Sequence, residues 1–278
     1  MARVNRGERV AFIVKALVER PAATLSLSAF AERFGAAKST ISEDLAIIRR
    51  GIESTGTGSL VTMAGASGGV KYLPRRQPED VRRVAQSVCD RLNSPDRILP
   101  GGFLYMTDVI TSPLLAWEIG EVFATQFADS GVDYVVTMET RGIPIALMTA
   151  RAMNLPLVIC RRDSRVTEGP SVSINYVSGS TRTIQRMSLP KRAIREGSRA
   201  LVIDDFMKGG GTARGIADLL GEFDATVAGT CVVVATGEPR TKLVEGFLPL
   251  TVLESVDEFN RRVTVNPGGW VPVGPGGL

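Results

Sequence analysis

The chain has 278 residues, a net charge of +4 and an apolar fraction of 44%. These values suit a small globular domain joined to a medium one, and they exclude a disordered or fibrous protein. Because histidine is absent, Ser-His-Asp and Cys-His nucleophile systems, imidazole bases and histidine-containing zinc sites are excluded. Cys89, Cys160 and Cys231 stand far apart, so we expect buried thiols in a reducing cytoplasm rather than disulfides or a four-cysteine zinc site.

No segment of the sequence suits a membrane. The most apolar stretch without charge, 225–237, has 13 residues, whereas a spanning helix needs about 20. The first nine residues are polar and basic, unlike a secretory signal. A soluble protein without a membrane partner is therefore expected.

The positive charge is unevenly distributed. Residues 1–74 hold 10 basic and 6 acidic side chains, while 23 basic and 23 acidic side chains cancel in 75–278. This asymmetry predicts a basic N-terminal module attached to a neutral body. Charge alone leaves the alternative open that the excess is an accident of a solvated surface.

Three helices and a hairpin are predicted in the N-terminal module. The third helix begins near Thr40, which forms an expected capping box with Glu43 and follows a short turn containing Gly35. A helix-turn-helix followed by a hairpin is typical of a winged helix, so 1–74 is predicted to be a winged-helix DNA-binding domain. The helices are expected at 7–20, 28–35 and from about 40, and the strands at 59–63 and 70–73.

Polar and basic side chains are expected on the exposed face of the third helix, where they suit phosphates and base edges in the major groove. Glu43 and Asp44 are expected either to limit non-specific binding or to form local pairs. The residues predicted to bind DNA are Lys38, Ser39, Thr40, Ser42, Arg49 and, on the hairpin, Lys71, with Arg3, Arg6 and Arg9 as further candidates for backbone contacts.

Residues 75–278 alternate between apolar strands and helices, which predicts βαβ units and a parallel sheet flanked by helices. A hairpin at 171–188 interrupts the alternation, and the Gly- and Pro-rich tail at 266–278 is expected to be irregular. The strands are expected at 134–138, 157–160, 200–203 and 227–234, and the helices at 79–93, 112–127, 143–153 and 215–223.

The most informative segment is an apolar strand, 200–203, that runs into Asp204 and Asp205 and then into a glycine-rich loop and a helix. Loop amides, the Thr212 hydroxyl and the helix N-terminus can hold a phosphate, while paired carboxylates can accept hydrogen bonds from vicinal sugar hydroxyls. The segment therefore predicts a site for a ribose 5-phosphate moiety. A plain connection between strand and helix would not explain the two acids. The predicted ligand-binding residues are Asp204, Asp205, Phe206, Met207, Lys208, Gly209, Gly210, Gly211 and Thr212.

This segment resembles the phosphoribosyl pyrophosphate (PRPP) loop of type I phosphoribosyltransferases. A second loop, 137–144, also follows a strand and opens a helix. The resemblance implies that its backbone amides bind pyrophosphate, assisted by Arg141. The hairpin at 171–188 takes the place of the family's mobile arm, from which Arg182 and Arg186 are candidates to reach anions. The residues assigned to the pyrophosphate loop are Met138, Glu139, Thr140, Arg141 and Gly142.

Nearly the whole chain resembles the purine operon repressors of Gram-positive bacteria, in which a winged helix precedes a type I phosphoribosyltransferase-like domain. The segments that carry the resemblance are 38–45, 102–108, 173–180 and 204–212. It implies a cytoplasmic, nucleoid-associated homodimer that binds double-stranded operator DNA and represses genes of purine biosynthesis and transport. It also implies that PRPP weakens DNA binding, that guanosine tetraphosphate or another purine nucleotide is a competing ligand, and that Mg²⁺ is present only as PRPP carries it.

We expect binding without catalysis, and hence no catalytic residue and no metal site. Lys208 stands where transferases of this class usually carry a small residue, so we hypothesise that it alters ligand preference or disables transfer. Tyr105 is a candidate contact to a base. Two alternatives remain: a purine phosphoribosyltransferase with an accessory N-terminal domain, and a bifunctional protein that both transfers phosphoribose and binds nucleic acid.

Overall fold

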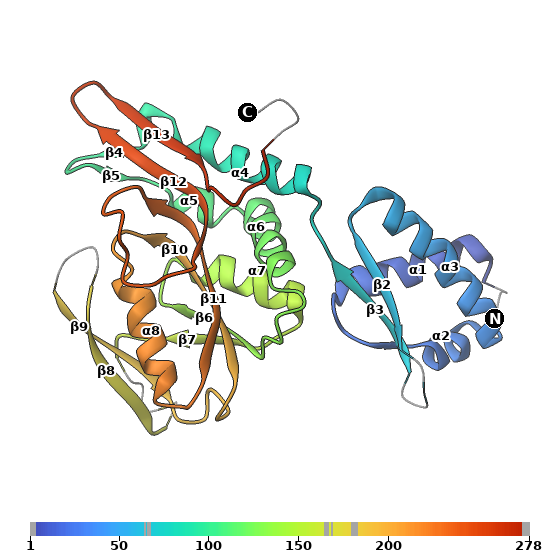
Figure 1. Cartoon of the computed structure of the whole chain (residues 1–278). Coiled ribbons are helices and arrows are strands. Elements are labelled where there is room, and N and C mark those ends of the chain that lie inside the picture. Colours follow the sequence, from blue (N-terminus) through green and yellow to red (C-terminus); the bar gives the residue numbers. More distant parts are fainter. Residues whose placement is uncertain are drawn as a thin grey trace. The chain divides into compact units, whose positions relative to one another are not determined.

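The structure is a computed structural model that describes residues 4–63, 65, 68–163, 167, 169–178 and 183–273. It contains two compact units (Figure 1), the first consisting mainly of Met1–Gln77 and the second of Pro78–Ala150 and Leu155–Leu278. Arg3 and Arg182, two predicted anion contacts, lie outside the described residues. None of the described helices is long and apolar enough to cross a membrane.

The first unit is a winged helix. Ile13 and Leu17 of α1, Ile41, Leu45 and Ile48 of α3, and Val70 and Tyr72 of β3 are buried in one core, together with Phe30 and Leu60. In its antiparallel sheet, β3 lies between β1 and β2. The elements are α1 (Arg6–Glu19), β1 (Leu25–Ser26), α2 (Leu27–Phe34), α3 (Lys38–Thr55), β2 (Gly58–Met63) and β3 (Gly69–Pro74).

The predicted capping box at Thr40 and Glu43 is wrong. Helix α2 ends at Phe34, and the φ of 58° at its C-cap residue, Gly35, reverses the chain at once, so α3 already begins at Lys38. Its N-cap residue is Ala37, which makes no capping hydrogen bond through a side chain. The capping box in this unit is instead formed by Asn5 and Glu8 at the start of α1.

The second unit is built on a six-stranded sheet within the described residues, with the strand order β13-β12-β11-β10-β6-β7. All neighbours are parallel except β12 and β13. The strands are β6 (Tyr134–Met138), β7 (Leu157–Cys160), β10 (Arg199–Met207), β11 (Thr226–Thr236), β12 (Leu248–Asp257) and β13 (Arg262–Pro267).

Three features of this sheet differ from the sequence-based expectation. Strand β10 does not end at Ile203 but continues through the two aspartates to Met207, paired with β11. Strand β12 was not anticipated. The tail predicted to be irregular begins inside β13, because Asn266 pairs with Val252 at the sheet edge.

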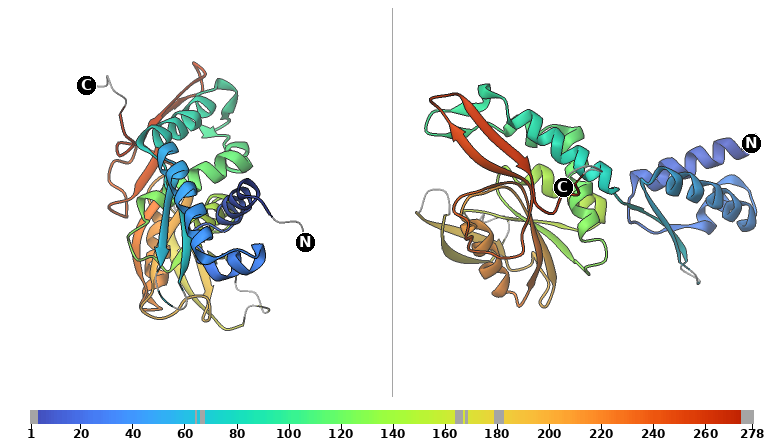
Figure 2. Two further views of the ribbon diagram at one scale, coloured as in Figure 1. Left: turned by 90° about the vertical axis from the view of Figure 1, so that its right-hand side faces the viewer. Right: turned by 45° about the horizontal axis from the view of Figure 1, so that its top comes forward.

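Helices cover both faces of the sheet (Figures 1 and 2). On one face, α8 and the hairpin of β8 and β9 pack over Val136 and Val202. Along β12 and β13 lies α4, followed by Asn93, whose side-chain amide exchanges two hydrogen bonds with the backbone of Val265. The remaining elements are α4 (Pro78–Leu92), η1 (Pro95–Arg97), β4 (Ile98–Leu99), β5 (Phe103–Leu104), α5 (Thr107–Ile110), α6 (Pro113–Gln126), α7 (Ile143–Met153), β8 (Ser171–Val177), β9 (Ile184–Pro190) and α8 (Gly211–Gly221).

The three cysteines are buried free thiols, which confirms the prediction for their side chains. Burial raises the pKa of Cys89 and of Cys160 to about 12 and raises that of Cys231 as well. The thiols therefore serve as small core residues.

Candidate functional site

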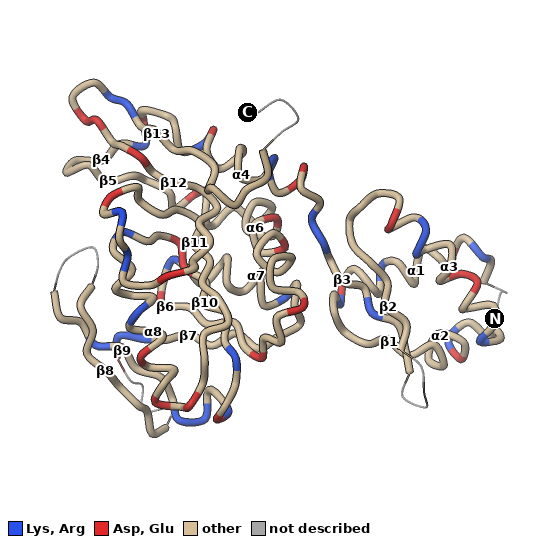
Figure 3. Tube along the Cα trace, viewed as in Figure 1, with Lys and Arg blue, Asp and Glu red and all other residues tan. Residues whose placement is uncertain are grey.

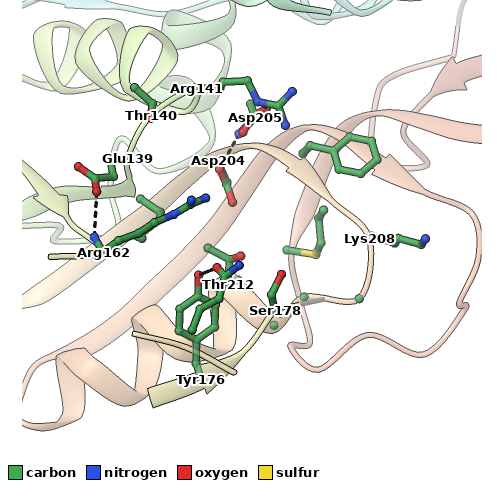
Figure 4. Close-up of a pocket in the computed structure, with 18 residues that line it drawn as sticks. Glu139, Thr140, Arg141, Arg162, Tyr176, Ser178, Asp204, Asp205, Lys208 and Thr212 are labelled. Carbon is green, nitrogen blue, oxygen red and sulfur yellow. Dashed lines mark hydrogen bonds and ion pairs between the residues drawn. The ribbon is translucent and has the colours of Figure 1, made fainter. Parts of the chain in front are cut away.

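One cavity of about 280 Å³ brings the two predicted loops together (Figure 4). The loops follow β6 and β10, which are parallel neighbours, so both leave the sheet at the same edge. All nine residues of the predicted PRPP loop line the cavity, and so do Met138, Glu139, Thr140 and Arg141 of the other loop. Ala213 and four residues outside both loops complete the lining: Arg162, Tyr176, Ser178 and Gln185.

The two aspartates at the end of β10 are buried, with Asp204 8% and Asp205 6% exposed. Asp204 Oδ1 accepts a hydrogen bond of 2.9 Å from the Asp205 amide. Burial and the neighbouring charge of Asp205 raise the pKa of Asp204 well above its ordinary value. Asp205 Oδ2 lies 3.1 Å from Arg141 Nε, and this ion pair links the two loops across the cavity.

The loop after β6 is held in place by hydrogen bonds to the residues that follow β7. The Glu139 carboxylate accepts a hydrogen bond of 2.9 Å from the Arg162 amide and one of 3.3 Å from Arg161 Nη1, both just beyond β7. Gly142 lies behind the cavity lining rather than in it. A Cβ there would overlap Thr137 Oγ1 and stand 3.2 Å from Asp204 Oδ1, so only glycine lets the loop approach β10 so closely.

The glycine-rich loop leads directly into a helix. Gly210 has a φ of 81°, and α8 begins at the next residue, earlier than the predicted start at 215. Thr212 is therefore in the first helical turn and lines the cavity. The partial positive charge of the helix N-terminus favours an anion at this position.

The arm contributes residues that sequence reasoning missed. Strands β8 and β9 form the predicted hairpin, and the paired residues Tyr176 and Gln185 both line the cavity. The Tyr176 hydroxyl donates a 2.9 Å hydrogen bond to Gln185 Oε1, and burial raises its pKa. The sequence did carry one signal for Tyr176. Side chains alternate between the two faces of a strand, so once the hairpin is known the alternation along β8 assigns Tyr176 to its inner face. Arg186 instead donates to the Ser173 hydroxyl and does not line the cavity.

A second cavity, of about 370 Å³, shares the walls Arg141, Phe206 and Lys208 with the first. Its other side includes the apolar residues Phe103, Leu104, Met106 and Leu253. Lys208 extends away from the aspartates (Figure 4). Tyr105, the predicted base contact, lines neither of these two cavities and is 44% exposed.

The residues predicted to bind DNA lie at two places in the first unit: at the start of α3, and at or beside the hairpin of β2 and β3. Lys38, Ser39 and Ser42 are exposed on the first turns of α3, where Thr40 is partly exposed. Arg49, farther along α3, donates a 2.6 Å hydrogen bond to the Thr62 hydroxyl of the hairpin. Lys71 pairs with Val61, and strand alternation places it on the opposite face of the hairpin from the buried Val70 and Tyr72.

Helix α3 is anchored to α1 by charge. Asp44 is fully buried, and its carboxylate accepts hydrogen bonds from Arg9 Nε at 2.8 Å and from Arg6 Nε at 3.3 Å. Arg9 is thus occupied in the fold, and its side chain is only 13% exposed. Glu43 is exposed and lies 3.9 Å from Arg6, so both acids form the local pairs considered above. Basic residues occur along both α1 and α3 (Figure 3).

Comparisons with known proteins match both units. Residues 5–74 match the family described as bacterial purine repressor, N-terminal, and residues 109–267 match the phosphoribosyl transferase domain. The purine biosynthesis transcriptional repressor PurR of Bacillus subtilis is 42% identical over 97% of this chain and 94% of its own length. The purine biosynthesis transcriptional activator PurR of Lactococcus lactis subsp. lactis is 36% identical over 95% of this chain and 98% of its own length. The xanthine phosphoribosyltransferase of Lactococcus lactis subsp. cremoris is 31% identical over 61% of this chain and 89% of its own length.

Proposed function

Because this chain belongs to the bacterial purine repressor family, in which a winged helix precedes a type I phosphoribosyltransferase fold, we propose that it is a DNA-binding repressor of purine biosynthesis and transport genes. PRPP is its inducer. The protein acts in the cytoplasm, as a homodimer on double-stranded operator DNA at the nucleoid. The observation that carries the proposal is the cavity in which Asp204, Asp205 and the glycine loop meet Thr140 and Arg141.

The cavity suits each part of PRPP. Asp204 and Asp205 would accept hydrogen bonds from the two ribose hydroxyls, and the amides of 208–212 with the Thr212 hydroxyl would hold the 5-phosphate. Arg141 and the backbone of 139–142 would hold the pyrophosphate. Mg²⁺ would come with the ligand. Among the described residues no group of three or more Asp, Glu or Cys side chains is arranged to hold a metal ion.

The winged helix would read the operator. Lys38, Ser39 and Ser42 would contact phosphates and base edges from the start of α3, while Asp44 holds the helix against α1. PRPP would lower operator affinity by binding more tightly to the DNA-free state, and linkage requires operator DNA to lower PRPP affinity by the same factor. Guanosine tetraphosphate would compete for the same cavity and oppose induction.

The direction of regulation separates two members of the family, since one relative is named a repressor and another an activator. Repression follows here from the relative with the higher identity of these two. In vitro transcription from a purine promoter tests it directly. We expect added protein to lower the transcript level and PRPP to restore it, whereas a rise on protein addition would assign this chain to the activating type.

Transferase activity is the second candidate, favoured by the similarity to a xanthine phosphoribosyltransferase and by the second cavity beside the first. We propose that the fold serves as a sensor and that Lys208 alters ligand preference or disables transfer. Pyrophosphate release should be measured with adenine, guanine, hypoxanthine and xanthine, each with PRPP and Mg²⁺. Steady turnover with any base would replace the sensor by an enzyme or a bifunctional protein.

The decisive experiment measures DNA binding and its response to ligand in one assay. Fluorescence anisotropy of a purine-promoter duplex and a scrambled duplex should show a clear preference for the promoter, which PRPP reduces. Asp204→Ala should keep promoter affinity and lose the response to PRPP. Equal affinity for both duplexes would contradict operator recognition. A normal PRPP response of Asp204→Ala would contradict the assignment of the cavity.

A further inference from the structure

The segment 237–247, which connects β11 to β12, lies behind the glycine-rich loop and contacts it through the backbone. The Leu243 amide donates a 2.9 Å hydrogen bond to the Gly209 carbonyl. A Cβ on Gly210 would come within 3.2 Å of the Leu243 nitrogen and 3.4 Å of Val244 Cγ2, so the two segments are closely packed. We refer to 237–247 as the support segment.

A second tie runs through the last residue of β11. Thr236 Oγ1 lies 2.6 Å from the Glu238 carbonyl and 3.3 Å from the Lys208 carbonyl, two acceptors for its single proton. Lys242 Nζ donates to the Thr236 carbonyl at 2.8 Å and to Thr236 Oγ1 at 3.2 Å. The Lys242 ammonium thus connects the end of the turn to its start at Thr236, and the next residue, Leu243, donates to Gly209.

Lys242 is placed for structure rather than for direct contact with a ligand. It is partly buried, and this burial lowers its pKa. It does not line the cavity that holds the aspartates. Arg240, two residues away, differs in this respect, because its ion pair with Glu238 is almost entirely exposed, at 91% and 76%.

We propose that Lys242 is a positioning residue for ligand binding: by closing the turn of the support segment, it holds the carbonyls of Lys208 and Gly209 from behind and so keeps the amides of the loop directed at the phosphate. A preorganised loop binds more tightly because less ordering is required when the ligand arrives. This inference rests on the proposed function, since it concerns the affinity for PRPP in the same cavity.

The test uses the full-length protein and two independent readouts. The first is hydrogen exchange at the Leu243 amide without ligand, corrected for the effect of sequence on intrinsic exchange. The second is the Kd of PRPP with Mg²⁺ by calorimetry. Lys242→Met keeps the aliphatic stem and removes the donors, and we expect about tenfold faster exchange and about tenfold weaker PRPP binding. Lys242→Arg should restore most of both, because a guanidinium can donate to the same oxygens.

Arg240→Met is the matched control, since it removes one positive charge from the same segment without touching Thr236 or Gly209. It should leave both readouts at the wild-type level. The proposal would be overturned if Arg240→Met and Lys242→Met weakened PRPP binding equally while the Leu243 amide stayed protected from exchange. The effect on affinity would then be one of long-range charge. Unchanged exchange and affinity in Lys242→Met would also overturn it.

A second variant keeps the test decisive if Lys242→Met does not fold. Thr236→Val removes the hydroxyl near Lys208 and keeps the Thr236 carbonyl, so we expect a smaller change in the same direction. If Thr236→Val kept the wild-type PRPP affinity and the wild-type protection of the Leu243 amide, the proposed role of the contact between Thr236 and Lys208 would be contradicted. If the wild-type protein itself failed to bind PRPP, the proposed function would fall. The exchange at Leu243 would then still decide whether Lys242 holds the loop.

Discussion

Arg141 Nε and Asp205 Oδ2 lie 3.1 Å apart, so the residue predicted to bind pyrophosphate forms an ion pair with one of the two predicted to bind ribose. The Arg141 side chain is 56% exposed and the Asp205 side chain only 9%. Among the described atoms, Asp205 Oδ2 receives no hydrogen bond of acceptable geometry. The contact is thus a charge pair with an acceptor site left over. A sugar hydroxyl could occupy that site while Arg141 turns to a phosphate.

Arg141→Gln should therefore weaken PRPP binding. Hydrogen bonds to charged groups contribute about 1.5–3 kcal/mol, which corresponds to roughly 10–100-fold in Kd. Calorimetry with PRPP and Mg²⁺ measures the change. Arg214→Gln is the control, because Arg214 also lies beside the glycine loop but pairs with Asp218 on its own helix at 2.9 Å. Equal losses in both variants would mean that only the overall charge of this edge matters.

Asp204 is expected to reduce stability at neutral pH. Its pKa is raised in the folded chain by burial and by Asp205, whereas the unfolded carboxyl titrates near its ordinary value of 3.8. The folded state therefore binds this proton more tightly. Stability is lost as the pH rises from 3.8 towards the raised pKa of the folded chain, and it stays lost above that pKa.

Asp204→Asn removes this titration while keeping an oxygen to accept from the Asp205 amide. We expect a higher Tm than wild type at neutral pH, by about 2–4 °C for each kcal/mol gained, and no difference below pH 3.8. Asp218→Asn on the exposed face of α8 is the matched control. Thermal melts across the pH range measure both. A higher Tm for the wild type than for Asp204→Asn at neutral pH would show that the buried Asp204 carboxylate does not destabilise the fold.

Gly142 provides a test of close packing behind the cavity. A Cβ at this position would overlap Thr137 Oγ1 and crowd Asp204. Gly142→Ala should destabilise the second unit by about 1–3 kcal/mol and weaken PRPP binding, as overpacking does elsewhere. Gly221→Ala at the end of α8, where a Cβ meets nothing within 4 Å, is the control. Chemical denaturation followed by Trp117 and Trp270 gives the stability of the second unit. Wild-type behaviour of Gly142→Ala would show that the loop can move aside.

The ligand loop was predictable from sequence because its signal is local. A continuous apolar run, two acids and three glycines are typical of a buried parallel strand that ends at a phosphate site. Arg162 and Gln185 gave no such signal, since they reach the cavity only through the strand order and through the register of the hairpin. Strand β12 was missed because it is only partly buried, lies next to the edge strand β13, and lacks the long apolar run of β10.

Asp44 is a different case, because the signal was present in the helical period. Ile41, Leu45 and Ile48 mark the buried face of α3, and position 44 lies three residues after Ile41 on that same face. A carboxylate on a buried stripe requires a partner, and Arg9 on α1 provides it. The order of α1 and α3 in the sequence does not reveal that pairing before the fold is known.

Asp44→Asn should selectively destabilise the winged helix. It removes one partner of a buried ion pair and leaves Arg9 poorly solvated, a change expected to cost about 3 kcal/mol. Both tryptophans, Trp117 and Trp270, lie in the second unit, so their fluorescence reports only that unit. We expect an early transition by circular dichroism, an unchanged tryptophan transition, lost DNA binding and retained PRPP binding. Glu43→Gln, at the exposed neighbouring acid, should change none of these.

The charge of the recognition helix is tested by the salt dependence of DNA binding. Each phosphate neutralised by a basic side chain contributes about −0.9 to the slope of log K against log salt concentration. Lys38 is exposed at the start of α3, so Lys38→Ala should weaken binding to promoter and scrambled duplexes alike and reduce the steepness of the slope by about 1. Lys15→Ala on α1 is the matched control, because Lys15 is also exposed but pairs with Glu19 on its own helix. An unchanged slope in Lys38→Ala would place Lys38 away from the DNA backbone, whereas a loss confined to the promoter duplex would make it a contact to a base.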